Sequence, residues 1–230
     1  MQTPRPPAIP ANLSPPTPSS LTPPTVILAD GQYPTHPIPL HALTTAGTVV
    51  CCDGAAVKLW AHGRAPDHIV GDLDSLPGDL QRRFADRLHH ITSQETNDLT
   101  KAVGFCTQHH VAQLTIVGAT GLREDHTIAN ISLLADYAAQ CDIEMLTDYG
   151  TFTVVRQTAT LASYAGQPVS LFSLTPAVPL SSDGLRYPLH GQPLHSWWKG
   201  SLNEAAGNAF TLRFDSGVFI IFRGHRSIRK

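Results

Sequence analysis

The chain has 230 residues, of which 42% are hydrophobic and 15% charged, and its formal net charge at pH 7 is −2. This length and apolar content suffice for one large or two small domains with buried cores. The near-neutral charge, without a basic stripe interleaved with aromatics, argues against a nucleic-acid partner, and no apolar run is long enough to predict a membrane span.

The first 24 residues differ in composition from the rest of the chain. They are rich in Pro, Ser and Thr and contain almost nothing to bury, which predicts a disordered or polyproline extension over residues 1–24. The apolar core of a signal peptide is missing from this stretch. The four cysteines form no Cys-x-x-Cys pair, which favours free thiols in a reducing, cytoplasmic compartment.

Residues 25–150 alternate short apolar runs with helical patterns. Strands are predicted at 26–28, 48–52, 68–70, 90–92, 114–117 and 143–146, and helices at 40–45, 55–62, 75–88, 98–106 and after 121. Ser75 is predicted to cap the helix over 75–88. The alternation predicts a parallel sheet covered on both faces, in a Rossmann-like α/β domain over residues 25–150.

From residue 151 the pattern changes. Strands are predicted at 152–155, 169–174, 184–189, 208–214 and 218–222, separated by turns and without a convincing helix. We therefore expect a second, antiparallel domain over residues 151–230.

Two carboxylates follow the predicted strand at 68–70, in the sequence Gly71-Asp72-Leu73-Asp74-Ser75. Gly71 permits a sharp turn, and side chains two residues apart in an extended turn leave on one face. Like charges so close repel each other unless a cation holds both, and carboxylate oxygens suit Mg²⁺ shared with substrate phosphates. The alternative is a solvated Asp-rich loop that caps the next helix.

Polar clusters also follow the other predicted strands of this domain, where ligands of open parallel sheets bind. They are Asp30-Gly31, Asp53-Gly54, residues 94–98 and residues 118–125. Gly118-Ala-Thr-Gly121 before a helix brings backbone N–H groups toward a phosphate, and Arg123 adds a charge-assisted contact. Neither a P-loop nor a Gly-x-Gly-x-x-Gly motif is present, and zinc spacings and a nucleophile elbow are also missing.

Taken in order, these segments resemble the thiamine pyrophosphokinase (thiamine diphosphokinase) family. The resemblance extends over residues 26–222. It rests on Cys52-Asp-Gly-Ala55, Gly71-Asp-Leu-Asp-Ser75, Gln94-Glu-Thr-Asn-Asp-Leu-Thr-Lys101, Gly118-Ala-Thr-Gly-Leu-Arg-Glu-Asp-His126, Gly184-Leu-Arg-Tyr-Pro-Leu189 and Gly200-Ser-Leu-Asn-Glu204.

The resemblance implies an α/β ATP-binding domain followed by a β-sandwich, assembled as a homodimer. It implies transfer of a diphosphoryl group from ATP to the hydroxyl of thiamine, with thiamine diphosphate and AMP as products. Asp72, Asp74 and Asp98 would then be the catalytic, Mg²⁺-holding carboxylates. The implied ATP-binding residues are Asp53, Gly54, Gln94, Lys101, Thr120, Arg123 and Asp125.

The resemblance places thiamine between subunits. It makes Tyr187, Ser201, Asn203 and Trp197 the candidates for that site. Either Tyr187 or Trp197 would supply an aromatic face for the thiazolium cation, a contact worth roughly 0.5–2 kcal/mol. Which aspartate accepts the proton of the hydroxyl stays open.

Two other functions fit the same residues. One is a different Mg²⁺-dependent phosphotransferase or phosphohydrolase that uses these carboxylates on another substrate. The second is a thiamine- or nucleotide-sensing module without turnover. Retention of Asp72, Asp74 and Asp98 argues against mere sensing, since ligand binding alone would tolerate neutral side chains there.

Overall fold

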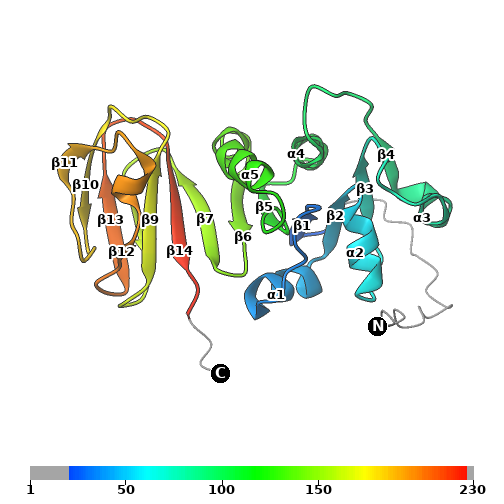
Figure 1. The fold of residues 1–230 in the computed structure, drawn as a ribbon, viewed down its shortest axis with the longest axis horizontal. Coiled ribbons are helices and arrows are strands. Elements are labelled where there is room, and N and C mark those ends of the chain that lie inside the picture. The colour runs from blue at the N-terminus through cyan, green and yellow to red at the C-terminus, as the bar shows by residue number, and fades with distance from the viewer. Residues whose placement is uncertain (1–20, 227–230) are drawn as a thin grey trace.

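The computed structural model describes residues 21–226. Apart from residues 21–24, the extension predicted for residues 1–24 lies outside the described part. The described chain folds into an elongated molecule whose main sheet runs from one end to the other (Figure 1).

That main sheet has ten strands in the order β12-β9-β14-β7-β6-β5-β1-β2-β3-β4. Its six parallel strands are β1 (Thr25–Leu28), β2 (Thr48–Cys52), β3 (His68–Gly71), β4 (Leu88–His90), β5 (Gln113–Val117) and β6 (Asp142–Leu146). Every residue of β1, β2 and β3 is buried, as expected for strands covered on both faces. The predicted α/β domain is confirmed.

The sheet continues into the second half of the chain with antiparallel strands. These are β7 (Gly150–Val155), β14 (Phe219–Gly224), β9 (Pro168–Ser173) and β12 (Asn203–Glu204). A second sheet, in the order β11-β10-β13-β8, consists of β8 (Ala159–Ala162), β10 (Pro179–Asp183), β11 (His190–Pro193) and β13 (Ala209–Arg213). The two sheets enclose an apolar core that includes Leu171, Phe210 and Ile221, so the predicted β-sandwich is confirmed.

Helices cover both faces of the parallel part. The helices are α1 (Pro37–Thr45), α2 (Ala55–Ala61), α3 (Gly78–Arg83), α4 (Asp98–Gln108) and α5 (Glu124–Tyr137), with 3-10 turns η1 (Ala85–Arg87) and η2 (Trp197–Gly200). Residues of α1, α2 and α3 share one core with Val26 and Ile69, whereas residues of α4 and α5 share the opposite core with Ile27 and Ile116. The chain thus changes faces between β1 and β5, and a crevice opens beyond such a switch point.

Three local predictions are wrong. The strand predicted at 90–92 lies two residues earlier, as β4, and Ile91 and Thr92 are outside it. No strand forms at 184–189: β10 ends at Asp183, Gly184 takes a φ of +77°, and β11 begins at His190. The predicted helix over 75–88 is confined to α3 and η1, and Ser75 does not cap it, because Pro77 is the N-cap residue. The Ser75 backbone N–H donates instead to Asp53 Oδ2, at 3.1 Å, which draws this turn toward the neighbouring strand end.

Within residues 21–226, no helix is both long and apolar enough to cross a membrane.

Candidate active site

The turn after β3 places Asp72 and Asp74 at the carboxyl end of the sheet. Leu73 between them takes a φ of +67°, a left-handed conformation that is costly for a branched residue. The Asp74 N–H lies 3.4 Å from Asp72 Oδ1, and the Ser75 hydroxyl donates to Asp74 Oδ1 at 3.1 Å. The residue of this turn with a left-handed backbone is therefore Leu73, and not the preceding Gly71.

Gly71 permits a close approach between β3 and the end of β2. A Cβ on Gly71 would lie 2.9 Å from the Asp53 Cβ, a separation that packed side chains do not reach. Asp53 follows β2 directly, so it stands beside the turn at the end of the adjacent strand β3. The absence of a side chain at Gly71 thus lets the carboxylate of Asp53 join Asp72 and Asp74.

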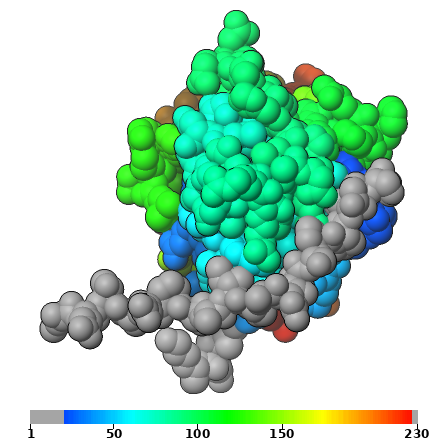
Figure 2. Space-filling view, turned by 90° about the vertical axis from the view of Figure 1, so that its right-hand side faces the viewer, coloured from blue at the N-terminus to red at the C-terminus, as the bar shows by residue number. Residues whose placement is uncertain are grey.

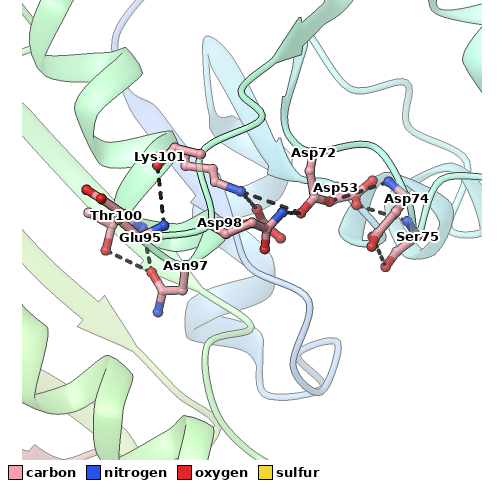
Figure 3. Close-up of polar contacts among 11 residues, drawn as sticks. Asp53, Asp72, Asp74, Ser75, Glu95, Asn97, Asp98, Thr100 and Lys101 are labelled. Atoms are coloured by element: carbon pink, nitrogen blue, oxygen red, sulfur yellow. Dashed lines mark hydrogen bonds and ion pairs between the residues drawn. The ribbon is translucent and has the colours of Figure 1, made fainter.

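Asp53, Asp72 and Asp74 form the acidic cluster of the cleft, with one carboxylate oxygen of each lying within 4.8 Å of the others (Figure 3). Asp53 is 2% exposed, and its Oδ1 is buried without a hydrogen-bond partner. Burial raises the pKa of Asp53 to about 6, and the charges of Asp98, Asp72 and Asp74 add to the shift. Three carboxylates whose oxygens lie this close together match the donor set that a hard divalent cation prefers.

Lys101 lies between two of the predicted catalytic aspartates. Its ammonium group, 3% exposed, is 2.8 Å from Asp98 Oδ1 and 3.7 Å from Asp72 Oδ2. Burial alone lowers the pKa of Lys101, but the hydrogen bond and charge of Asp98 and the charge of Asp72 outweigh it, so the pKa is raised. The carboxylate of Asp98 is therefore already paired, in contrast to that of Asp53.

Gln94 joins the same group from the loop between β4 and α4, which rises above the edge of the sheet (Figures 1 and 2). Its side-chain Nε2 donates to Asp72 Oδ2 at 3.0 Å, and this hydrogen bond is the main reason that the pKa of Asp72 is lowered. Three of the predicted positions, Gln94, Asp98 and Lys101, thus converge on the turn after β3.

The glycine turn, residues 118–121, forms the opposite side of the crevice. Gly118 and Gly121 take φ values of +68° and +93°, and the Gly31 and Gln32 N–H groups donate to the Gly118 and Thr120 carbonyls. A Cβ on Gly31 would lie only 2.4 Å from the Gly118 carbonyl oxygen, so the loop after β1 packs directly on this turn.

Arg123 and Asp125 lie just beyond the glycine turn, both well exposed. Arg123 Nη2 is 2.5 Å from Asp125 Oδ2, with side chains 69% and 62% exposed. The hydrogen bond from Arg123 lowers the pKa of Asp125 to about 2. Arg123 therefore lines the crevice as the positive half of an exposed ion pair with Asp125.

The crevice between these two sides has a volume of about 380 Å³. Its lining includes Asp30, Ser75, Asp98, Thr120, Arg123 and His126. Gly54 does not line the crevice but lies against Asp30, which does: a Cβ on Gly54 would meet the Asp30 carboxylate at 2.7 Å. The crevice lies beyond β1 and β5, at the switch point of the sheet, as expected for a ligand site.

The four residues predicted to bind thiamine lie elsewhere. Asn203 on β12 is hydrogen-bonded to the backbone of Tyr187, through Oδ1 at 3.1 Å and Nδ2 at 2.8 Å. Ser201 donates to the Trp198 carbonyl, and the Trp197 indole N–H donates to the Ser173 carbonyl. Tyr187 is 59% exposed and Trp197 is 40% exposed.

Within one chain, this second cluster does not meet the carboxylates. Strand β12 forms one edge of the ten-stranded sheet, whereas β3 and β4 form the other. At about 4.8 Å per strand, the two groups stand on the order of 40 Å apart.

Sequence reasoning did not place Asp53 among the carboxylates that face a cation. The sequence feature that indicates this position is the succession of acidic turns: Asp53 follows β2, Asp72 and Asp74 follow β3, and these two parallel strands are paired directly. The Lys58 contacts were also missed; its ammonium group bonds the Asp30 and Gly31 carbonyls and the Asp30 carboxylate, which anchors the loop after β1.

Comparison with family models gives two matches that together span most of the chain. Residues 40–146 match the model of the thiamin pyrophosphokinase catalytic domain, and residues 150–222 match that of the thiamin pyrophosphokinase substrate-binding domain. A comparison with curated protein sequences finds no significant match.

Solved structures of similar fold carry the same family name. The thiamin pyrophosphokinase of Geobacillus thermodenitrificans is 24% identical, with a TM-score of 0.73 and coverage of 89% of this chain and 98% of that one. The Bacillus subtilis structure is 21% identical, with a TM-score of 0.71 and coverage of 88% and 100%. That from Candida albicans is 17% identical, with a TM-score of 0.72 and coverage of 93% and 95%.

Proposed function

Because the chain belongs to the thiamin pyrophosphokinase family, we propose specific roles for its cleft residues in that family's reaction. The enzyme transfers a diphosphoryl group from ATP to the hydroxyl of thiamine, giving thiamine diphosphate and AMP. The single observation that supports these roles is the cluster of Asp53, Asp72 and Asp74, in which the Asp53 carboxylate is buried and its Oδ1 has no hydrogen-bond partner.

The cluster fits Mg²⁺, because it offers three carboxylates whose oxygens lie within 4.8 Å of each other. It adjoins the crevice through Ser75, which lines the crevice and is hydrogen-bonded to Asp53 and Asp74. Asp53, Asp72 and Asp74 would hold the ion, and Asp98 would orient it from beside Lys101. When bound, Mg²⁺ neutralises charge on the triphosphate and orients it. Without a cation, the three carboxylates repel each other, and burial holds the pKa of Asp53 above its usual range.

The triphosphate of ATP occupies the crevice between the acidic cluster and the glycine turn. Lys101 supplies a buried positive charge on one side, and Arg123 an exposed one on the other. Gln94 holds Asp72 in place, and Thr120 lines the crevice. Asp125 and Gly54 act indirectly, through the wall residues Arg123 and Asp30 that they contact. In-line transfer needs this positioning and charge neutralisation more than it needs a covalent nucleophile.

Thiamine binds against Tyr187, Trp197, Ser201 and Asn203 of a second subunit in a homodimer. This arrangement is supported by the distance within one chain, since β12 and β3 lie near opposite edges of the sheet. The Tyr187 ring is the more open of the two aromatic candidates, because Trp197 is already packed edge-on against Phe172, with ring centroids 5.6 Å apart. An aspartate of the partner's acidic cluster would accept the proton of the thiamine hydroxyl.

The proposed compartment is the cytoplasm. All four cysteines are free, and Cys51, Cys52 and Cys106 are buried. Burial raises the pKa of Cys106 to about 12, so its thiol is unreactive at neutral pH. Free thiols are typical of proteins in reducing compartments.

The metal assignment is tested by titrating the protein with Mn²⁺, an oxygen-seeking ion that reports its binding by electron paramagnetic resonance. Asp53→Asn and Asp72→Asn are expected to weaken binding at least tenfold, because each removes a charged ligand. Asp79→Asn is the matched control, since Asp79 is an acid in the first turn of α3. Equal Mn²⁺ affinity in all three variants would refute the assignment.

A further inference from the structure

The crevice has two sides that must keep a fixed separation. One side is the segment from Gln94 to Lys101, which presents Asp98 to the turn after β3. The other is the glycine turn, residues 118–121. The two sides come from segments that are not neighbours in the chain. The pairing of β1 with β5 positions the glycine turn, which follows β5, but it does not position the segment from Gln94 to Lys101.

Asn130 on α5 is hydrogen-bonded to both sides. Its side-chain Nδ2 donates to the Ala119 carbonyl at 2.9 Å, inside the glycine turn. Its Oδ1 accepts from Asn97 Nδ2 at 3.2 Å, and Asn97 immediately precedes Asp98. One amide thus bridges the carboxylate side and the phosphate side of the cleft.

The orientation of both amides is fixed by backbone groups at the two ends of this chain of hydrogen bonds. The Ala119 carbonyl can only accept, so the NH₂ of Asn130 must face it and its oxygen must face Asn97. At the other end, the Thr100 N–H can only donate, and it donates to Asn97 Oδ1 at 2.9 Å as the N-terminal cap of α4 (Figure 3). Each amide therefore has a single satisfying orientation, and loss of either one breaks the bridge.

A second contact between α5 and α4 lies seven residues further along α5. The buried Tyr137 hydroxyl is 2.7 Å from Thr100 Oγ1, on the same face of α5 as Asn130, because positions i and i+7 align on a helix. The Thr100 hydroxyl in turn donates to Asn97 Oδ1 at 2.8 Å, so Tyr137 supports the Asn97 end of the bridge but makes no hydrogen bond of its own to the glycine turn. A comparison of Asn130 with Tyr137 therefore distinguishes a hydrogen-bonded bridge to the glycine turn from packing of α5 against α4.

We propose that Asn130 is a positioning residue for diphosphoryl transfer, which sets the separation between Asp98 and the glycine turn through its two hydrogen bonds. The proposal rests on the proposed function of the cleft. Asn130 lines the crevice, but its Nδ2 and Oδ1 already bond Ala119 and Asn97, and its proposed role is exerted through these two residues. A small displacement of positioning groups can cost about 100-fold in rate, so the effect is measurable.

The test compares Asn130→Ala with Tyr137→Phe, each of which removes one contact between α5 and α4. Asn130→Ala is expected to lower kcat/KM for ATP by roughly 10- to 100-fold and to leave the KM for thiamine within about twofold of the wild type. Tyr137→Phe should keep kcat/KM within about threefold, because Asn97 Oδ1 still accepts from the Thr100 N–H and hydroxyl, and both hydrogen bonds of Asn130 remain. Equal effects of the two variants on ATP would overturn the proposal.

A double-mutant cycle provides the second readout. Asn97→Ala combined with Asn130→Ala should cost no more in kcat/KM than the worse single variant, because both break the same bridge. Full additivity of the two losses would overturn the proposal. If Asn130→Ala does not fold, Asn130→Asp takes its place, since it preserves size and the acceptor for Asn97 but offers no donor to Ala119.

The same variants are measured for affinity toward a non-hydrolysable ATP analogue with Mg²⁺, which needs no turnover. A rise in Kd for Asn130→Ala, but not for Tyr137→Phe, supports the bridge, whereas unchanged Kd and kcat/KM refute it. If the wild-type protein binds the analogue but forms no AMP, the proposed function is refuted. The comparison of Kd values between Asn130→Ala and Tyr137→Phe would then still test the proposed role of Asn130.

Discussion

Gly71 determines how closely the carboxylates can approach at the scale of single residues. A methyl group at this position would meet the Asp53 Cβ at 2.9 Å and Asp98 Oδ1 at 3.4 Å. Gly71→Ala is therefore expected to push Asp53 away from the turn, to destabilise the fold by about 1–3 kcal/mol and to reduce activity at least tenfold. Denaturant unfolding and initial rates of AMP formation measure the two effects.

Gly104→Ala is the matched control for this prediction. Gly104 lies inside α4, and a Cβ there would meet nothing within 4 Å. The exchange should stabilise the protein by about 0.5–1 kcal/mol, because alanine favours a helix interior over glycine. If Gly71→Ala and Gly104→Ala lose activity equally, the loss is not caused by a collision between the Cβ at position 71 and Asp53.

Lys101 provides a second prediction at this scale. Its buried ammonium group compensates Asp98 and Asp72, so Lys101→Met leaves two carboxylates facing each other. In EDTA, the midpoint of thermal unfolding should fall by several degrees, and millimolar Mg²⁺ should recover part of the loss by neutralising the same carboxylates. A loss of identical size with and without Mg²⁺ would indicate that these carboxylates hold no cation.

The sequence alone predicts Asp72 and Asp74, because a short spacing after an apolar run is a local signal. The closeness of Asp53 is not local: it depends on the pairing of β2 with β3 and on the missing side chain of Gly71. The contact of Ser75 is non-local in the same way. Its N–H serves Asp53, on a neighbouring strand, and not the helix that follows.

At the scale of elements, the pairing of β3 with β4 brings the buried His68 against the half-buried His89. His68 Nδ1 lies 2.9 Å from His89 Nε2, and His68 Nε2 is buried without a hydrogen-bond partner. Burial and the charge of His89 lower the pKa of His68 to about 4, although Asp67 opposes the shift. The pair is therefore neutral in the folded protein at physiological pH.

Because the pKa of His68 is lower in the folded than in the unfolded chain, the free energy of unfolding depends on pH. The unfolded chain binds a proton at His68 near pH 6.5 and the folded chain only near pH 4, so stability is present above pH 6.5 and is lost as the pH falls toward 4. The loss amounts to at most about 3 kcal/mol, and to less where water screens the ring. Urea unfolding at pH 7, 6, 5 and 4 measures it.

His68→Phe should flatten that pH dependence, because the ring volume stays and the titrating group is gone. His110→Asn is the control: His110 is exposed after α4 with a φ of +57°, a conformation that asparagine tolerates. If His68→Phe and the wild type lose stability in parallel between pH 6.5 and pH 4, the buried histidine is not the cause.

The predictability of the elements differs between the two halves of the chain. Strands such as β1 and β2 are continuous apolar runs, and their burial on both faces makes them readable from sequence. The strand β10, Pro-Leu-Ser-Ser-Asp, has no such signal and exists because it pairs with β11 and β13. Short polar strands of this kind form because of the strands they pair with, and a local sequence pattern gives no information about those partners.

At the scale of the whole molecule, the acidic cluster and the predicted thiamine residues lie near opposite edges of one sheet. A homodimer that joins them across its interface predicts complementation. Asp72→Asn and Asn203→Ala, each nearly inactive alone, should regain up to about one quarter of wild-type activity per total subunit after mixing and subunit exchange, because some mixed dimers contain one intact composite site.

Asn203→Asp mixed with Asn203→Ala provides the control, since both variants damage the same half of the site and no intact combination can form. Activity that stays at background in the first mixture, with subunit exchange verified, would contradict a shared site. It would require thiamine to bind within a single subunit.

The most direct test of the central claim is the product analysis of purified protein incubated with Mg²⁺, ATP and thiamine. The account predicts AMP and thiamine diphosphate in equal amounts, formed only when thiamine is present and abolished by Asp72→Asn in a protein that still folds. ADP or inorganic phosphate in place of AMP, or undiminished turnover by Asp72→Asn, would contradict it.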